Sequence, residues 1–379
     1  MTLRPNVCKT VAVAAIATVA GSVAFAASGT KETHPPLAPL PPVPIPVDNP
    51  MTPEKIELGK KLFWDYRLSG DNSTPCVSCH FPALGWGDNS PISRGYPGTK
   101  HWRNSQTILN SAYYNKLFWE GNVTSLEGQA PAAAEGAVAG NGDTAMMEMR
   151  LRFIPEYVEA FKKVYGIDWP RMNQAYQAIA AYQRTVVSDA AKVPFDRFAK
   201  GDKSALTDAQ KRGKALFEGK AGCIRCHNGP LASNQEYYSL GLPEYPEFKS
   251  DELYQITHRW EQYQKGVPEA VYRTADRDMG LYYQTMNPAD IGKFRVPSLR
   301  ETKYTAPYMH NGLFTTLAEV VDFYDKGAGP LPDKSPLLKP LGLTAAEKAD
   351  LVAFVESLSM DEPLIHEDPK LPGDYQPLK

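Results

Sequence analysis

The chain has 379 residues, a formal net charge of −2 and 42% hydrophobic residues. This length and composition can supply two ordinary domain cores. Nothing in the charge balance indicates nucleic acid as a partner.

Residues 1–26 have the pattern of a secretory signal peptide. A weakly basic start, with Arg4 and Lys9, precedes an uncharged apolar run from Val11 to Phe25 and an Ala24-Phe25-Ala26 ending. An uncleaved membrane anchor is the alternative, but the apolar run is short for a span. We therefore expect a periplasmic protein with no membrane span after leader cleavage.

Residues 27–50 are predicted to be a proline-rich linker. The segment from His34 to Val47 reads HPPLAPLPPVPIPV, and so many prolines exclude a helix and favour an extended chain. It either connects domains or lies as a strap over a domain surface.

A short module occurs twice. Thr52 and Pro53 begin a predicted helix that contains Ile56 to Phe63, with threonine as the N-cap. Thr207 to Gln210 forms a capping box before a matching helix that contains Arg212 to Phe217. Both helices carry the pattern GK-x-LF, and the repeat indicates two related domains.

Each module leads into a Cys-x-x-Cys-His motif. The first is Cys76, Cys79 and His80, and the second is Cys223, Cys226 and His227. This spacing is the attachment signature of a c-type haem, in which two cysteines add to the porphyrin vinyl groups and the histidine binds the iron. A zinc site would need four ligands around one ion, and each pair here has its own histidine. Because the fifth cysteine, Cys8, leaves with the leader, the sequence predicts two covalently bound haems and no disulfide.

The remaining segments are predicted from their apolar periodicity. Helical spacing occurs in 146–161, 169–187 and near 316–324, and a capping box at Thr344 begins a last helix to about residue 358. Residues 194–200 are expected to connect the two domains. Residues 234–288 are rich in tyrosine, glycine and proline, and we expect long loops there.

The predicted fold is therefore mainly α, with two cytochrome c-like haem domains and long loops. The expected boundaries are residues 51–193 for the N-terminal domain and residues 194–379 for the C-terminal domain.

Several ordered motifs resemble those of the bacterial dihaem cytochrome c peroxidases and their relative MauG, over about residues 51–360. They are GKKLF before the first haem motif, Arg103-Asn104, Phe118 to Gly121, Gln129 and the segment VPSLRETKYTAPYMHNG. In this family an N-terminal haem reacts with peroxide and a C-terminal haem transfers electrons.

The resemblance implies roles for individual residues. His80 and His227 would be the proximal iron ligands, and Trp119 would relay oxidising equivalents between the haems. The alternative for Trp119 is a buried core tryptophan. Calcium at the domain interface is implied, with oxygen ligands from Asn104, Thr305 and Pro307. The alternative for these three residues is a simple loop cap.

The second ligand of the C-terminal haem distinguishes two mechanisms. Cytochrome c peroxidases of the family place a methionine there, MauG places a tyrosine, and the matching residue here is Tyr324. A hard phenolate oxygen favours Fe(III) and higher oxidation states, whereas a soft thioether favours Fe(II). Tyr324 therefore indicates storage of oxidising equivalents, with Met309 as the rival ligand.

The chain departs from the family pattern at two positions. A histidine that caps the resting peroxidatic haem in many relatives is replaced by Tyr96, with His101 five residues later, so we expect that haem to be open. The distal glutamate, ten residues after the glutamine, is replaced by Ala139. Peroxide cleavage needs a proton-transfer group, for which Glu135 is the candidate, together with Gln129. A surface carboxylate is the alternative for Glu135.

These features predict an oxidoreductase, a peroxidase acting on hydrogen peroxide. The N-terminal haem would reduce peroxide and share oxidising equivalents through Trp119 with the Tyr324-ligated haem. Electrons would come from a protein partner, as in MauG. An ordinary cytochrome c peroxidase with a small cytochrome donor and a non-enzymatic dihaem electron carrier are the alternatives. A homodimer is a possible assembly, because peroxidases of this family are often dimers.

Overall fold

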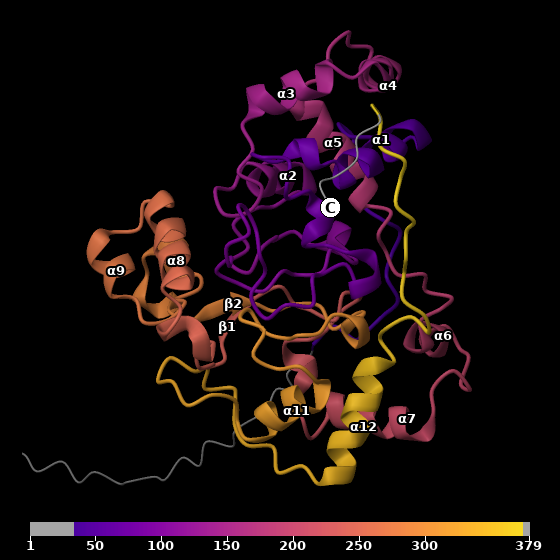
Figure 1. Ribbon diagram of the computed structural model, residues 1–379. Coiled ribbons are helices and arrows are strands. Elements are labelled where there is room, and N and C mark those ends of the chain that lie inside the picture. Colours follow the sequence, from indigo (N-terminus) through magenta and orange to yellow (C-terminus); the bar gives the residue numbers. More distant parts are fainter. Residues whose placement is uncertain (1–33, 374–379) are drawn as a thin grey trace, which may run out of the picture. The chain divides into compact units, whose positions relative to one another are not determined.

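The computed structural model describes residues 34–373. The predicted signal peptide and Cys8 lie outside the described residues. The described part is mainly helical, as predicted, with one small antiparallel sheet of two strands (Figure 1). The helices are α1 Pro53–Trp64, α2 Leu126–Ala134, α3 Thr144–Arg152, α4 Pro155–Tyr165, α5 Met172–Gln183, α6 Pro194–Ala199, α7 Asp208–Glu218, α8 Glu252–Gln264, α9 Glu269–Thr274, α10 Tyr282–Thr285, α11 Leu317–Asp325 and α12 Ala345–Glu356; the strands are β1 Tyr237–Ser239 and β2 Lys293–Arg295.

The predicted helix starts are confirmed. The Thr52 side chain caps α1, and Pro53 occupies its first turn. Capping boxes form at Thr207 and Thr344, where a glutamine or glutamate three residues later bonds back to the capping residue. Residues 146–161 form two helices rather than one, because Pro155 begins α4 and cannot continue α3.

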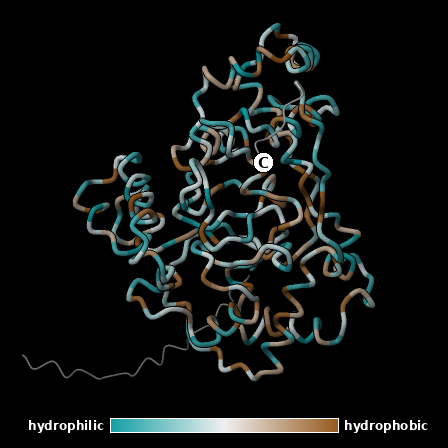
Figure 2. The backbone as a smooth tube through the Cα atoms, in the orientation of Figure 1, coloured by the Kyte–Doolittle hydropathy of each residue, from teal (hydrophilic) through white to brown (hydrophobic). Residues whose placement is uncertain are grey.

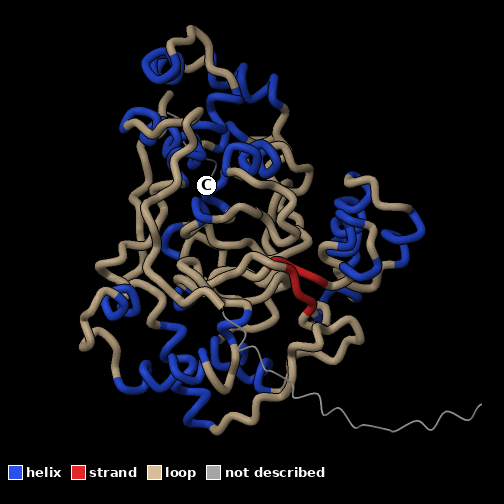
Figure 3. The backbone as a smooth tube through the Cα atoms, turned by 180° about the vertical axis from the view of Figure 1, so that it is seen from behind, coloured by secondary structure: helices blue, strands red, loops and turns tan. Residues whose placement is uncertain are grey.

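Two hydrophobic clusters organise the helices. The first is built mainly by α1 and α5, with Phe63 and Phe161 fully buried. The second is built mainly by α7 and α12, with Phe217 and Phe354 fully buried. Long irregular segments fill the space between these helical parts (Figure 3).

The repeated glycine explains why the GK-x-LF pattern occurs in both helices. A Cβ on Gly59 of α1 would lie 1.9 Å from the Ala178 carbonyl oxygen of α5. A Cβ on Gly213 of α7 would lie 1.9 Å from the Asp350 carbonyl oxygen of α12. Only glycine allows two helix backbones to approach so closely.

Two extended segments connect the clusters. In the proline-rich segment, Leu37 is buried in the second cluster, and Asn49 donates to the Gln177 carbonyl oxygen at 2.9 Å. After α12 the chain returns to the first cluster, where the indoles of Trp64 and Trp86 donate to Asp368 and the Leu364 carbonyl. In Figure 1 this C-terminal segment runs from α12 to the neighbourhood of α1.

The expectation of long loops throughout 234–288 is wrong. The helices α8 and α9 occupy 252–264 and 269–274. The buried side of α8 carries the polar residues Thr257, His258 and Gln262 beside Tyr254, so an apolar period is weak. Figure 2 shows polar and apolar residues mixed along this segment. Tertiary packing against Trp102, Phe248 and Tyr283 stabilises the helix instead.

The glycine contact yields a stability prediction. Gly59→Ala is expected to lower the free energy of unfolding by about 1–3 kcal/mol, because the new methyl group must push α1 away from α5. Chemical denaturation measures this change. Gly87→Ala is the control, because its Cβ would meet no atom closer than 3.7 Å. Equal stability of the two variants would contradict the close crossing.

Candidate functional site

A single cavity of about 570 Å³ extends between the two Cys-x-x-Cys-His motifs. It is lined by most of the residues singled out in the sequence: Cys76, Cys79, His80, Asn104, Trp119, Gln129, Cys226, His227, Thr305, Pro307 and Tyr324. Met309, the rival of Tyr324, also lines it. The chain therefore brings the two motifs and the expected relay residue to one space.

The two motif histidines are oriented in the same way. His80 Nδ1 lies 3.1 Å from the Trp86 carbonyl oxygen, and His227 Nδ1 lies 3.2 Å from the Ala232 carbonyl oxygen. A carbonyl accepts only from a protonated Nδ1, so Nε2 is unprotonated and available as a metal ligand. Burial lowers the pKa of both histidines, to about 4 for His227, which keeps each ring neutral.

The first cysteine of each motif begins a one-turn helical segment, Cys76–Ser78 or Cys223–Arg225, and the second cysteine follows as its C-cap. None of the four cysteines at 76, 79, 223 and 226 forms a disulfide within the described residues. Burial raises the pKa of the Cys76, Cys79 and Cys223 thiols to about 12, so these groups are protonated at neutral pH.

The cavity wall beside the first motif is made of small side chains, which leaves room for a flat ring system. These wall residues are Ala130, Ala132, Ala133, Ala134, Gly136, Ala139 and Gly140. Paired thiols, a neutral imidazole with an available Nε2 and this open wall together fit a c-type haem. The second motif supplies the same paired cysteines and an imidazole oriented in the same way, and Tyr324 lies beside it.

Tyr324 lies on α11 beside the second motif. Burial and the neighbouring Cys223 and Cys226 raise the pKa of its phenol well above the usual value. Its ring packs against Phe323 with centroids 5.5 Å apart. The phenol therefore belongs to the surroundings of His227 rather than to those of His80.

One hydrogen bond and two aromatic contacts fix the position of the Trp119 ring. Its Nε1 donates to the Asn104 carbonyl oxygen at 3.0 Å, and its ring meets Phe294 and His310 edge-on at 6.5 and 6.3 Å. It is half-buried and faces the cavity. This position differs from that of a tryptophan enclosed in a core, such as Trp86, which is fully buried.

Asn104, Thr305 and Pro307 all line the cavity. The Asn104 amide nitrogen donates to the Ser90 carbonyl oxygen at 2.8 Å, which turns the amide oxygen away from that bond. Within the described residues, no group of three His, Cys, Asp or Glu side chains could hold a metal ion. Amide and carbonyl oxygens are nevertheless suitable calcium ligands.

Glu135 is not brought to the cavity. It caps the C-terminus of α2, where it accepts from Tyr176 at 2.8 Å and Thr144 at 2.7 Å, in a separate hollow with Glu148. Gln129 precedes it by six residues, and at about 100° per residue these side chains point to different sides of a helix. The expectation that both act at one site therefore does not fit the helix geometry.

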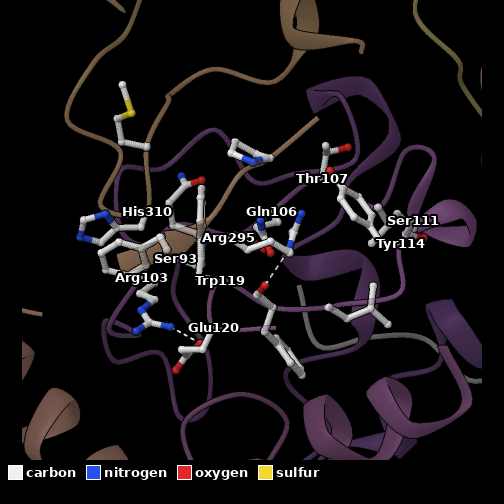
Figure 4. A pocket seen from close by; sticks show the side chains of 18 of the residues that line it. Ser93, Arg103, Gln106, Thr107, Ser111, Tyr114, Trp119, Glu120, Arg295 and His310 are labelled. Atoms are coloured by element: carbon white, nitrogen blue, oxygen red, sulfur yellow. Dashed lines mark hydrogen bonds and ion pairs between the residues drawn. The ribbon is translucent and has the colours of Figure 1, made fainter. Parts of the chain in front are cut away.

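A buried ionic cluster next to Trp119 was not anticipated. Arg103 pairs with Glu120, as Figure 4 shows. It also pairs with Asp278, whose carboxylate accepts at 2.5 and 2.9 Å. The guanidinium also lies 3.7 Å from the Trp102 ring centroid. Lys265, directly after α8, donates to Glu120 at 3.1 Å. The motifs Arg103-Asn104 and Phe118 to Gly121 pointed to two of these residues, but nothing in the sequence pointed to Asp278 or Lys265.

Each charged group in this cluster stabilises the ionised form of its partners. Burial alone would raise the pKa of Glu120 and Asp278, but Arg103 outweighs it and lowers both, with help from Lys265 at Glu120. Burial alone would lower the pKa of Arg103, and the two carboxylates raise it instead. All three groups are therefore charged at neutral pH.

Fold and cavity together fit a di-haem enzyme, and the comparisons agree on the di-haem family. A sequence model described as di-haem cytochrome c peroxidase matches residues 53–204. The chain is 74% identical to "Cytochrome-c peroxidase IdrP1" of Pseudomonas sp. (strain SCT), over 94% of each chain. It is 35% identical to "Methylamine utilization protein MauG" of Methylorubrum extorquens, over 87% of this chain and 85% of that protein.

A solved structure, "Crystal structure of a MauG-like protein associated with microbial copper homeostasis", superposes with a TM-score of 0.71 at 31% identity, covering 85% of this chain and 94% of that one. The chain belongs to the di-haem cytochrome c peroxidase family. It is a peroxidase, an oxidoreductase acting on hydrogen peroxide, and the family has two haem groups. The predicted family and enzyme class are confirmed.

The ionic cluster predicts a stability loss. Arg103→Met is expected to lower the free energy of unfolding by about 3–5 kcal/mol, because it leaves two buried carboxylates without their partner. Thermal or urea unfolding measures the loss. Adding Glu120→Gln and Asp278→Asn should recover much of it. A triple variant no more stable than the single one would show that lost packing is the cause.

The contribution of Asp278 to stability is expected to decrease in acid. The folded-state pKa of Asp278 lies below its unfolded value, so its contribution to stability is present above about pH 3.9 and lost as pH falls through the lower folded pKa. Unfolding followed between neutral and acidic pH should show this loss in the wild type and a smaller one in Asp278→Asn.

Proposed function

We propose that the chain is a periplasmic peroxidase in which two covalently bound haems have different tasks. The observation that carries the proposal is the asymmetry of the cavity. Both motif histidines present Nε2 in the same way, but Tyr324 of α11 lies beside the second motif, whereas small side chains of α2 and the segment after it border the first. The His80 side, bordered by small residues, is the site of peroxide reduction.

Haem supplies the iron chemistry that accepts an oxygen from peroxide and exchanges electrons. The chain supplies the rest. His80 and His227 would bind iron through Nε2, and Cys76, Cys79, Cys223 and Cys226 would attach the two rings. Tyr324 would give the second iron a hard ligand that favours its oxidised states.

Trp119 is the proposed connection between the two sites. Its indole faces the cavity that joins the motifs, and the Nε1 bond to the Asn104 carbonyl fixes the ring plane. An aromatic ring held in this way can pass an electron without moving. Calcium at Asn104, Thr305 and Pro307 would hold the same backbone in place, because Asn104 serves both groups.

Electrons come from a protein partner. Two specific forms remain distinct: a small cytochrome donor, favoured by the relative at 74% identity named cytochrome-c peroxidase, and a protein substrate, as the MauG resemblance suggests. No helix formed by residues 34–373 combines the length and apolar character that a bilayer crossing requires. Export by the predicted leader and assembly as a homodimer belong to the proposal.

Covalent attachment has a direct test. The mass of the purified wild-type protein should exceed that of its polypeptide by two haems, and the Cys223→Ala/Cys226→Ala variant should carry one haem fewer. Mass spectrometry after acid denaturation measures both. Ser78→Ala, between the cysteines of the first motif, is the control and should keep two haems. Loss of no haem from the double cysteine variant would overturn the assignment.

The Tyr324 assignment predicts a change of potential. Tyr324→Met should raise the reduction potential of one haem and leave the other unchanged, because a thioether stabilises Fe(II) relative to a phenolate. Spectroelectrochemical titration measures both potentials. Met309→Leu is the matched control and should leave both unchanged. A shift in Met309→Leu instead of Tyr324→Met would make Met309 the ligand.

A further inference from the structure

The wall of the cavity beside the first motif lacks the carboxylate that the family resemblance places there. The matching residue is Ala139, and Glu135 faces a different hollow. Peroxide reduction requires that a proton move from one peroxide oxygen to the other. The group that moves it must therefore come from another segment of the chain.

The hairpin from Ser93 to Arg103 packs directly against the Ala139 segment. Tyr96 N–H donates to the Ala139 carbonyl oxygen at 2.8 Å. A Cβ on Gly95 would lie 1.9 Å from the Val138 carbonyl oxygen, so the two backbones are in close contact. Gly95 and Ala139 both line the cavity. The hairpin is thus the neighbour of the position that lost its carboxylate.

The second strand of this hairpin brings an imidazole to the same wall. His101 N–H donates to the Ser93 carbonyl oxygen at 2.7 Å, and the side chains of both residues line the cavity. Among residues 34–373, no hydrogen bond to the His101 ring is found, whereas His80, His227, His258 and His366 each have one. The His101 ring nitrogens are therefore available to a molecule in the cavity.

Ser93 is an independent indication that a polar molecule belongs here. Its side chain is 4% exposed, lines the cavity, and its Oγ has no hydrogen-bond partner within the described residues. A buried hydroxyl without a partner is costly unless water or a ligand fills the site. Figure 4 shows Ser93 among the side chains that line the cavity.

The charges around His101 keep it in the form that can accept a proton. Burial, followed by the positive charges of Lys265, directly after α8, and of Arg103, two residues after His101, lowers the pKa of His101 to about 3; Glu120 opposes them weakly. The imidazole is therefore neutral at physiological pH, and the cations that surround it favour the return of any proton it accepts.

We propose that His101 is the proton-transfer group for hydrogen peroxide in this cavity, assisted by the Ser93 hydroxyl, in place of the carboxylate that Ala139 cannot supply. This inference rests on the proposed function, because it assumes that peroxide reacts on the His80 side. It assigns to the chain's own hairpin a task for which the sequence offered only Glu135.

The step balances as an acid–base transfer. The His101 imidazole would take the proton from one peroxide oxygen and return it to the other as the O–O bond breaks, so that the second oxygen leaves as water. The Ser93 hydroxyl would donate a hydrogen bond to the peroxide. Over the full cycle, two electrons from the protein donor and two protons from solvent convert the peroxide into two waters.

The test compares His101→Leu with the wild-type holoprotein. The rate of the absorbance change on adding hydrogen peroxide should fall by about 100-fold or more, the range expected for loss of a general acid–base group. The rate of cyanide binding should fall as well, because hydrogen cyanide must lose its proton to bind iron. His101→Leu/Ala139→Glu should regain much of both rates, because it returns a carboxylate to the neighbouring wall.

Tyr96→Phe is the matched control, since Tyr96 lies on the same hairpin and does not line the cavity. It should keep the wild-type rates. Wild-type rates in His101→Leu would overturn the proposal. So would a changed resting absorption spectrum in that variant, which would make His101 an iron ligand instead. A wild-type holoprotein that does not react with peroxide would overturn the proposed function itself.

Discussion

The arrangement beside Trp119 depends on one buried cation. Arg103 contacts Trp102 on its own strand, Glu120 directly after Trp119, and Asp278 from the segment that follows α8 and α9. A buried guanidinium is tolerated only when its donors are satisfied, and two carboxylates satisfy it here. Because Asn104 follows Arg103 and its carbonyl accepts from the Trp119 indole, fixing Arg103 also fixes the plane of that ring.

The two haem motifs are equal in sequence and nearly equal in local structure, yet they are placed in different surroundings. The same carbonyl contact orients His80 and His227. The neighbouring side chains differ. The α2 helix and the segment after it contribute small residues near the first motif, and α11 contributes the Tyr324 phenol near the second. A duplicated unit can acquire two tasks in this way without any change in its attachment motif.

Some of this structure could be predicted because local physics determines it. Capping residues marked the starts of α1, α7 and α12, and the repeated glycine reports a backbone contact that no other residue allows. The α8 helix escaped prediction because its buried face is polar and depends on distant partners such as Tyr283. The separation of Glu135 from the cavity could not be foreseen for a related reason: its sequence distance from Gln129 says little until the rotation of α2 is known. Asp278 and Lys265 gave no local signal, since their role exists only through Arg103.

The C-terminal segment after α12 has a consequence for the order of assembly. Trp64 and Trp86 belong to the first cluster, but their indole partners, Asp368 and Leu364, follow them by 304 and 278 residues in the chain. Because a polypeptide is made from its N-terminus, the first cluster stays open at this side until the segment after α12 has been synthesised. Closure of the first cluster around its motif is therefore a late step in the folding of this chain.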